Sequence, residues 1–228
     1  MNKSWLTIVF LGFATQAMTQ TSHFLPQQGP SDASINIAVS SDDENNGNSY
    51  FEEAEKNERK GELNEAITLF GKAAFEYNSS RQLDRYGSAL LRLSNVHYLL
   101  AHYTEAEQVI LNVALKNYSK LGSKSGLLDS YSQLGKIYLA DTKYTQSLWF
   151  YTQQGILAKQ LGNSRAYIES VIGIANVKIK KKDYILASRD LTRAELLASA
   201  SNFNQYKLQI REARALIPIK KALKKESK

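Results

Sequence analysis

From residue 50 onward, apolar side chains recur every three or four positions. Leu127, Tyr131, Leu134 and Tyr138 show the spacing that places side chains on one face of an α-helix. Proline removes a backbone hydrogen bond from a helix interior, and this long region contains only Pro218. The pattern therefore favours a succession of helices over a sheet-rich fold.

The same pattern repeats four times. One small residue marks the middle of a second helix in each copy, and these residues are 40, 41 and 40 positions apart: Ala66, Ala106, Ser147 and Ala187. Twelve positions earlier lies a second set of small residues: Ala54, Ser94, Gly135 and Ala175. Small residues let two helices approach closely, so each copy predicts a helical hairpin. One hairpin cannot bury its apolar face alone, and stacked neighbours can.

The connectors between hairpins also repeat. Leu121-Gly122-Ser123 and Leu161-Gly162-Asn163 predict a helix that ends at a glycine C-cap and is followed at once by a new N-cap.

The third copy resembles a known repeat. Tyr131-x-x-Leu134-Gly135-x-x-Tyr138, followed by Tyr144, Ser147 and Tyr151, is similar to the tetratricopeptide repeat (TPR), whose pattern is W-x-x-L-G-x-x-Y with a later A and F. The other copies match less completely. The period of about 40 exceeds the usual ~34, and the proline expected after the second helix is missing. The resemblance covers roughly residues 48–200. It implies an all-α fold, a right-handed α-solenoid of about four TPR-like hairpins with a C-terminal capping helix.

The first residues have the features of a secretion signal. Lys3 precedes the apolar run Trp5 to Ala14, and small residues follow where cleavage is expected. We interpret residues 1–19 as a signal peptide, with a buried N-terminal helix as the alternative. This interpretation predicts export to the periplasm or secretion.

Three further segments follow. Residues 20–47 are polar and acidic, which predicts a disordered linker, although Ile35–Val39 alternates like a strand and could pair. Residues 48–202 form the predicted repeat domain. Residues 203–228 are predicted to hold a capping helix from Phe203 to Lys225, kinked or interrupted at Pro218, and a basic tail.

The net charge of +7 is polarised along the chain. Residues 21–59 carry two basic and eight acidic side chains, whereas residues 204–228 carry eight basic and two acidic ones. The lysine-rich end is suited to a solvated helix terminus, and the alternative is peripheral contact with an anionic membrane or an acidic protein. Export argues against a nucleic acid as its partner.

The sequence contains no catalytic constellation. It has no cysteine, no P-loop, no G-x-S-x-G and no dinucleotide fingerprint. Of the three histidines, His97 occupies a packing position, and its spacing from His102 disfavours a zinc pair. We therefore predict a non-enzymatic protein without a cofactor or metal.

The resemblance also implies a binding surface, because the first helices of a TPR array line its concave face. The residue after the small residue in each first helix, with its neighbours one turn away, would meet a protein or peptide partner. This reasoning selects Asn95, Lys136, Asn176, Tyr98, Ser132, Leu91, Ile172 and Lys180.

Three function hypotheses follow. The first is an exported interaction scaffold or adaptor that binds a protein or peptide on this face. The alternative is a sensory or regulatory module of a bacterial signalling system, related to TPR-containing histidine kinases. A third is an envelope-associated protein that uses its lysine tail as an anchor.

Overall fold

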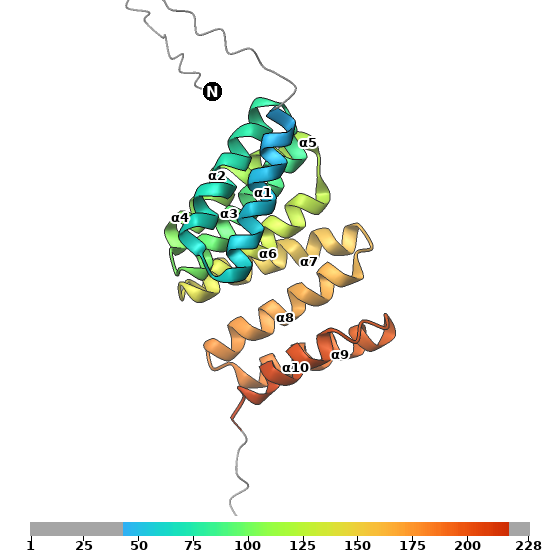
Figure 1. The fold of residues 1–228 in the computed structure, drawn as a ribbon. Coiled ribbons are helices and arrows are strands. Elements are labelled where there is room, and N and C mark those ends of the chain that lie inside the picture. The colour runs from blue at the N-terminus through green and yellow to red at the C-terminus, as the bar shows by residue number, and fades with distance from the viewer. Residues whose placement is uncertain (1–42, 219–228) are drawn as a thin grey trace, which may run out of the picture. The chain divides into compact units, whose positions relative to one another are not determined.

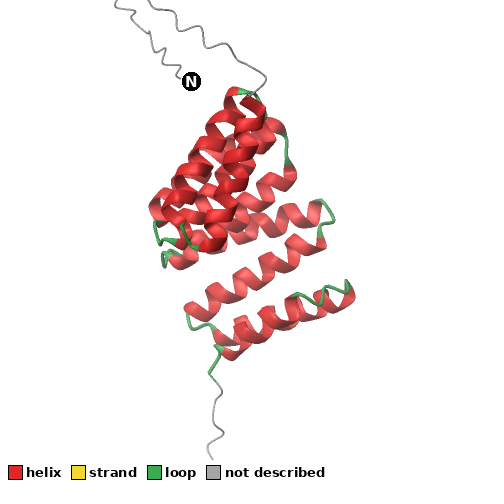
Figure 2. Ribbon diagram, in the orientation of Figure 1, coloured by secondary structure: helices red, strands yellow, loops and turns green. Residues whose placement is uncertain are grey.

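The computed structural model describes residues 43–218, and every structural statement below concerns that range. The predicted signal peptide, the strand-like run Ile35–Val39 and the lysines after Pro218 lie outside the described residues. Within the range there are helices and no strands (Figures 1 and 2). The helices are α1 (Asp43–Lys60), α2 (Leu63–Ser79), α3 (Leu83–Leu99), α4 (Tyr103–Gln108), the π-helix η1 (Val109–Ala114), α5 (Leu115–Leu121), α6 (Lys124–Ala140), α7 (Tyr144–Gln160), α8 (Ser164–Lys180), α9 (Tyr184–Ala200) and α10 (Tyr206–Ala215).

Consecutive helices pack against each other as antiparallel hairpins. The four hairpins are α1 with α2, α3 with the continuous α4–η1–α5 rod, α6 with α7, and α8 with α9. The first helices also contact one another along the array, α3 with α6, α6 with α8 and α8 with α10. The predicted all-α solenoid is therefore confirmed, and its first helices form one layer.

The small residues identified in the sequence lie where the helices of a hairpin cross. Seven of the eight are fully buried, and the remaining one, Gly135, is buried as well. Two of these crossings carry a hydrogen bond between the paired positions. The Ser94 hydroxyl donates to the carbonyl of Ala106 at 2.8 Å, and the Ser147 hydroxyl donates to the carbonyl of Gly135 at 2.7 Å. A serine can therefore replace alanine there without leaving an unsatisfied polar group.

Every interhelix turn has the same backbone geometry. One residue adopts a left-handed conformation, and the next residue donates its N–H to the carbonyl five positions earlier at 2.8–3.0 Å. This arrangement closes a helix C-terminus and satisfies its last carbonyls. The predicted C-caps at Gly122 and Gly162 are confirmed, as are the N-caps, because Ser123 accepts from the Gly126 N–H and Asn163 from the Ala166 N–H. The left-handed residues are Gly61, Arg81, Ala101, Gly122, Thr142, Gly162, Lys182 and Asn202.

These left-handed residues are 20 positions apart at every step except one. The step from Ala101 to Gly122 is 21, and that interval contains η1. A π-turn accommodates one additional residue within an α-helix. The π-helix thus absorbs the extra residue that makes one repeat 41 positions long, and the packing register continues on either side.

The ends of the array differ from the sequence expectations. Helix α1 begins at Asp43, inside the stretch 20–47 that was interpreted as linker. Helix α10 covers Tyr206–Ala215 instead of beginning at Phe203, and it ends before Pro218. A proline disfavours helical geometry in the residue before it, and the described helix ends ahead of Pro218, as expected for an interruption there. Among the described helices, none is both long and apolar enough to cross a membrane.

Candidate partner-binding groove

A groove of about 580 Å³ opens on the layer of first helices in the second half of the array. Its walls come from α3, α6, α8 and α10, and α7 contributes to its lining. Five of the eight residues selected from the sequence lie in this lining: Tyr98, Ser132, Lys136, Asn176 and Lys180. The structure thus brings together side chains from three repeats that are far apart in sequence.

The groove carries two exposed cations. Lys136 on α6 and Lys180 on α8 are exposed, and neither forms an ion pair within residues 43–218. Desolvation and the Glu169 carboxylate raise the pKa of Asp129, whereas Lys136 lowers it. Both ammonium groups therefore remain available to an anionic group of a ligand, and Lys136 also balances the nearby carboxylate of Asp129.

The Tyr151 ring is wedged between two glycines of neighbouring first helices. A Cβ atom added at Gly135 would lie 2.7 Å from the Tyr151 Cε1 atom, and one added at Gly173 would lie 2.5 Å from its Cδ1 atom. Tyr151 lines the groove although only 5% of its surface is exposed, and burial raises the pKa of its hydroxyl. The two glycines thus create the space in which this aromatic ring supports the groove between α6 and α8.

The far wall of the groove depends on α10. The Tyr206 hydroxyl donates to Glu169 Oε1 on α8 at 2.6 Å, and both residues line the groove with Gln209. Burial and this hydrogen bond raise the pKa of Tyr206. The sequence reasoning did not select these residues, because it considered only the four hairpins and treated α10 as a cap. It also left out Tyr144 and Tyr151, although both belong to the repeat pattern of the third copy.

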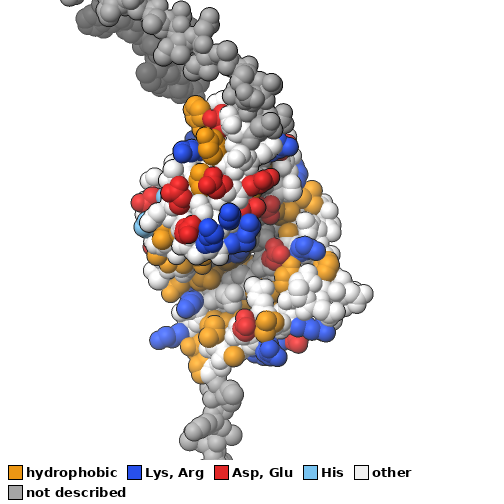
Figure 3. All heavy atoms as spheres, viewed as in Figure 1, with side chains coloured by type: hydrophobic (Ala, Val, Ile, Leu, Met, Phe, Trp, Pro, Cys, Tyr) orange, Lys and Arg blue, Asp and Glu red, His pale blue; other side chains and the backbone are white. Residues whose placement is uncertain are grey.

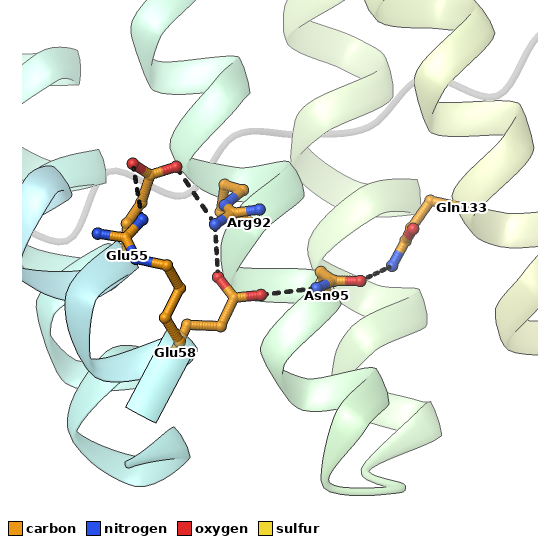
Figure 4. A network of polar contacts seen from close by, with 6 residues as sticks. Glu55, Glu58, Arg92, Asn95 and Gln133 are labelled. Carbon is orange, nitrogen blue, oxygen red and sulfur yellow. Dashed lines mark hydrogen bonds and ion pairs between the residues drawn. The ribbon is translucent and has the colours of Figure 1, made fainter. Parts of the chain in front are cut away.

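Asn95 does not belong to this groove. The Asn95 side-chain Nδ2 donates to Glu58 Oε1 at 2.9 Å, and the Asn95 Oδ1 accepts from Gln133 Nε2 at 3.4 Å (Figure 4). Arg92 completes the network by pairing with Glu58 at 2.7 Å and with Glu55 at 3.2 Å. These side chains come from α1, α3 and α6. Asn95 therefore connects three first helices, and its side-chain amide is used within the array instead of meeting a partner, as the sequence had led us to expect.

Two apolar residues selected from the sequence face the interior. Ile172 is fully buried, which contradicts its assignment to the binding surface. The reason is α10, whose Tyr206 and Ile210 pack with Ile172 in one hydrophobic cluster. Leu91 is partly buried against a core cluster that the first three hairpins share. Ser132, at the equivalent position of α6, lines the groove.

The histidines do not form a metal site in the described part of the chain, where no cluster of three or more metal-ligating side chains occurs. The rings of His97 and His102 lie 6.0 Å apart, and His97 is partly buried. Desolvation lowers the pKa of His97, with Glu105 opposing and His102 reinforcing this change.

Comparison with known proteins gives information on the type of fold. No family model and no curated protein matches this sequence. Among solved structures, BtubC (BKLC) from P. vanneervenii is similar, with a TM-score of 0.64 and 17% sequence identity over 72% of this chain and 67% of that chain. At this identity the likeness concerns the fold alone. Both chains are helical-repeat structures.

Proposed function

We propose that this protein is a non-enzymatic scaffold or adaptor of the TPR type, which binds a segment of another protein in the groove between α3, α6, α8 and α10. The observation that carries the proposal is the groove itself, because side chains from successive repeats converge on one hollow of about 580 Å³. Repeat arrays characteristically use the surface of their stacked first helices for protein binding.

The places of the repeated residues in the hairpins support the TPR assignment, in addition to their pattern in the sequence. The paired small residues of each copy cross at the centre of a hairpin, and Ser94 and Ser147 form hydrogen bonds there. The Tyr131-to-Tyr151 pattern belongs to the hairpin that forms the middle of the groove. A longer hairpin of 20-residue steps explains the period of about 40.

The lining of the groove favours an extended peptide that carries a carboxylate. Lys136 and Lys180 supply positive charge without an ion-pair partner in the described range, and the Asn176 amide offers both a donor and an acceptor. Tyr98 and Tyr144 supply partly exposed aromatic surface, which is typical of protein interfaces, and the buried Tyr151 ring supports it. A bound segment would thus gain charge complementarity from α6 and α8 and aromatic contacts from α3 and α7.

The test compares two charge reversals. The variant Lys136→Glu/Lys180→Glu changes the groove, and Lys116→Glu/Lys120→Glu changes two exposed lysines of α5 outside its lining. Each protein is used to capture partners from the cell envelope of its own source, with quantitative mass spectrometry. We expect a protein captured by the wild type and by the α5 variant to be lost from the groove variant. Equal capture by all three proteins would contradict the assignment of the groove.

Export is the second part of this proposal and rests on the Lys3 and Trp5–Ala14 pattern. Mass spectrometry of the protein purified from its source should show a mature chain that begins after the first 17 to 19 residues. An intact N-terminus in the cytoplasmic fraction would contradict export and leave the groove proposal unaffected.

A further inference from the structure

The corner of the array where α9 begins exposes large apolar side chains. Ile185 retains 73% of its surface, Leu186 46% and Leu216 62%. Ile185, Leu186, Ile217 and Pro218 line a hollow of about 970 Å³. The hollow lies between the start of α9 and the described residues that follow α10, which ends at Ala215.

The apolar side chains are accompanied by basic ones. Lys182 and Arg189 line the same hollow, and Lys181 is exposed beside it. None of these three forms an ion pair with another described residue, whereas nearby Lys178 pairs with Asp190 at 2.5 Å and Arg214 pairs with Glu195 at 2.8 Å. Asp183 is the only acidic residue in the lining. The corner therefore combines exposed hydrophobic surface with uncompensated positive charge.

The sequence that follows this corner is also strongly basic. Residues 219–228, which follow Pro218 directly, contain five lysines and one glutamate. In Figure 3, hydrophobic and basic side chains, with a few acidic ones, lie at the end of the array that holds α9 and α10, while most acidic side chains in this view lie over α1 to α3 beside a group of basic ones.

From these observations we infer that the corner formed by Lys181, Lys182, Ile185, Leu186, Arg189 and Leu216 docks on an anionic phospholipid bilayer. Its apolar side chains enter the interface between headgroups and acyl chains, and its cations contact the phosphates. Anionic lipid attracts lysine and arginine near its surface, and buried apolar area strengthens the binding. This surface is separate from the partner-binding groove, so an adaptor could hold a peptide while resting on a membrane.

A bilayer fits this corner better than an acidic protein does. Specific protein interfaces bury roughly 1,200–2,000 Å² with close shape complementarity. The corner instead offers a few exposed side chains at the start of α9 and just after α10, and Ile185 is largely exposed to solvent. A fluid interface accepts such isolated side chains without a matching shape.

The absence of cysteine makes a direct test available, since one engineered thiol can carry one fluorophore. In the full chain, Ile185→Cys is labelled with the environment-sensitive dye NBD. The matched control is Leu196→Cys, which lies on the same helix α9 and is 68% exposed. Each labelled protein is mixed with vesicles of phosphatidylcholine alone or with about 30% phosphatidylglycerol, a content chosen to give a strongly anionic surface.

We expect the dye at position 185 to shift to the blue and to brighten about twofold or more with the anionic vesicles only, as for a probe that enters an apolar interface. The dye at position 196 should respond little. An unchanged signal at position 185 would overturn the inference, and so would an equal response at both positions or with neutral vesicles. The apolar run near the N-terminus is common to both proteins, so it cannot produce a difference between them.

A charge reversal supplies the second measurement. In the Ile185→Cys background, Lys181→Glu/Lys182→Glu should weaken anionic-vesicle binding by about tenfold or more, because lysines near an anionic surface contribute strongly to binding. The control Lys116→Glu/Lys120→Glu has the same change of charge on α5 and should bind as before. Equal weakening by both variants would show a response to net charge alone and would overturn docking through this corner. Circular dichroism verifies that all variants keep their helical content.

Discussion

The wedge formed by Tyr151 makes the substitution Gly173→Ala unusually informative. Alanine stabilises most helix interiors relative to glycine, by about 1 kcal/mol. At Gly173, however, the new methyl group would lie 2.5 Å from the Tyr151 Cδ1 atom, and real side chains do not approach so closely. The ring would have to move, and Gly135 on its other side leaves no room, because a Cβ atom there would already lie 2.7 Å from Cε1.

The expected magnitude follows from these opposing effects. Adding a methyl group to a well-packed core costs about 1–3 kcal/mol, and a ring confined on both sides should be near the upper value. After subtraction of the helix-propensity gain, we expect the free energy of unfolding to fall by about 2 kcal/mol. For a domain of this size, the melting temperature should fall by about 4–8 °C.

The measurement is urea denaturation followed by circular dichroism at 222 nm. Gly71→Ala in α2 is the matched control, because it lies inside a helix and its added Cβ would meet nothing within 4 Å. That variant should be stabilised by about 0.5–1 kcal/mol. Combining Gly173→Ala with Tyr151→Leu should destabilise less than the sum of the two single changes. If Gly173→Ala is as stable as the wild type, the proposed confinement of Tyr151 is wrong.

Three further predictions concern the rest of the array. Deletion of Asn112, an exposed residue of η1, should convert the rod to regular α-helix and lower the free energy of unfolding by less than about 1 kcal/mol. Deletion of the exposed Thr152 in α7 should lower it by more than about 3 kcal/mol, because the buried residues that follow would move to another face of the helix. Thermal melts that show equal losses would contradict the role of the π-helix. Arg92→Met leaves the Glu58 carboxylate, whose side chain is 11% exposed, without its cation, and should lower the free energy of unfolding at pH 7 by about 1–2 kcal/mol in urea titrations. The folded-state pKa of His97 lies below its ordinary value, so the unfolded chain binds more protons and the free energy of unfolding should fall as the pH drops below about 6.5. His97→Gln should therefore lose less stability than the wild type between pH 7 and pH 5. An identical pH profile of the two proteins would refute this contribution.

The repeat was predictable from the sequence because its signals are local. A small residue at Ala66, Ala106, Ser147 and Ala187 fixes where each hairpin crosses, and glycines at positions 122 and 162 end helices in a conformation that other residues adopt at a cost. The remaining turns have the same left-handed geometry at residues such as Arg81 and Lys182, where the side chain gives no such signal. The helix-to-helix spacing therefore had to be inferred from the repeat itself.

The binding surface was only partly predictable. Lys136, Asn176 and Lys180 could be placed in one groove because equivalent positions of stacked repeats lie side by side. Asn95 is the repeat equivalent of Lys136 and Asn176, yet it is bound in a polar network. Ile172 is the repeat equivalent of Ser132, yet it is fully buried. The difference arises from partners on other helices.

The sequence by itself determined the helical hairpins, their number, their period and the polarity of charge, because each depends on spacing along one or two helices. Only the tertiary structure decided which repeated positions remain accessible. The Glu58 carboxylate of α1 binds the amide of Asn95. Helix α10 packs in one cluster with Ile172 and closes the groove through Tyr206, whereas Ile185 stays exposed beside the hollow at the start of α9. Burial depends on what the neighbouring element presents, and equivalent positions in a repeat have different neighbours at the ends of an array.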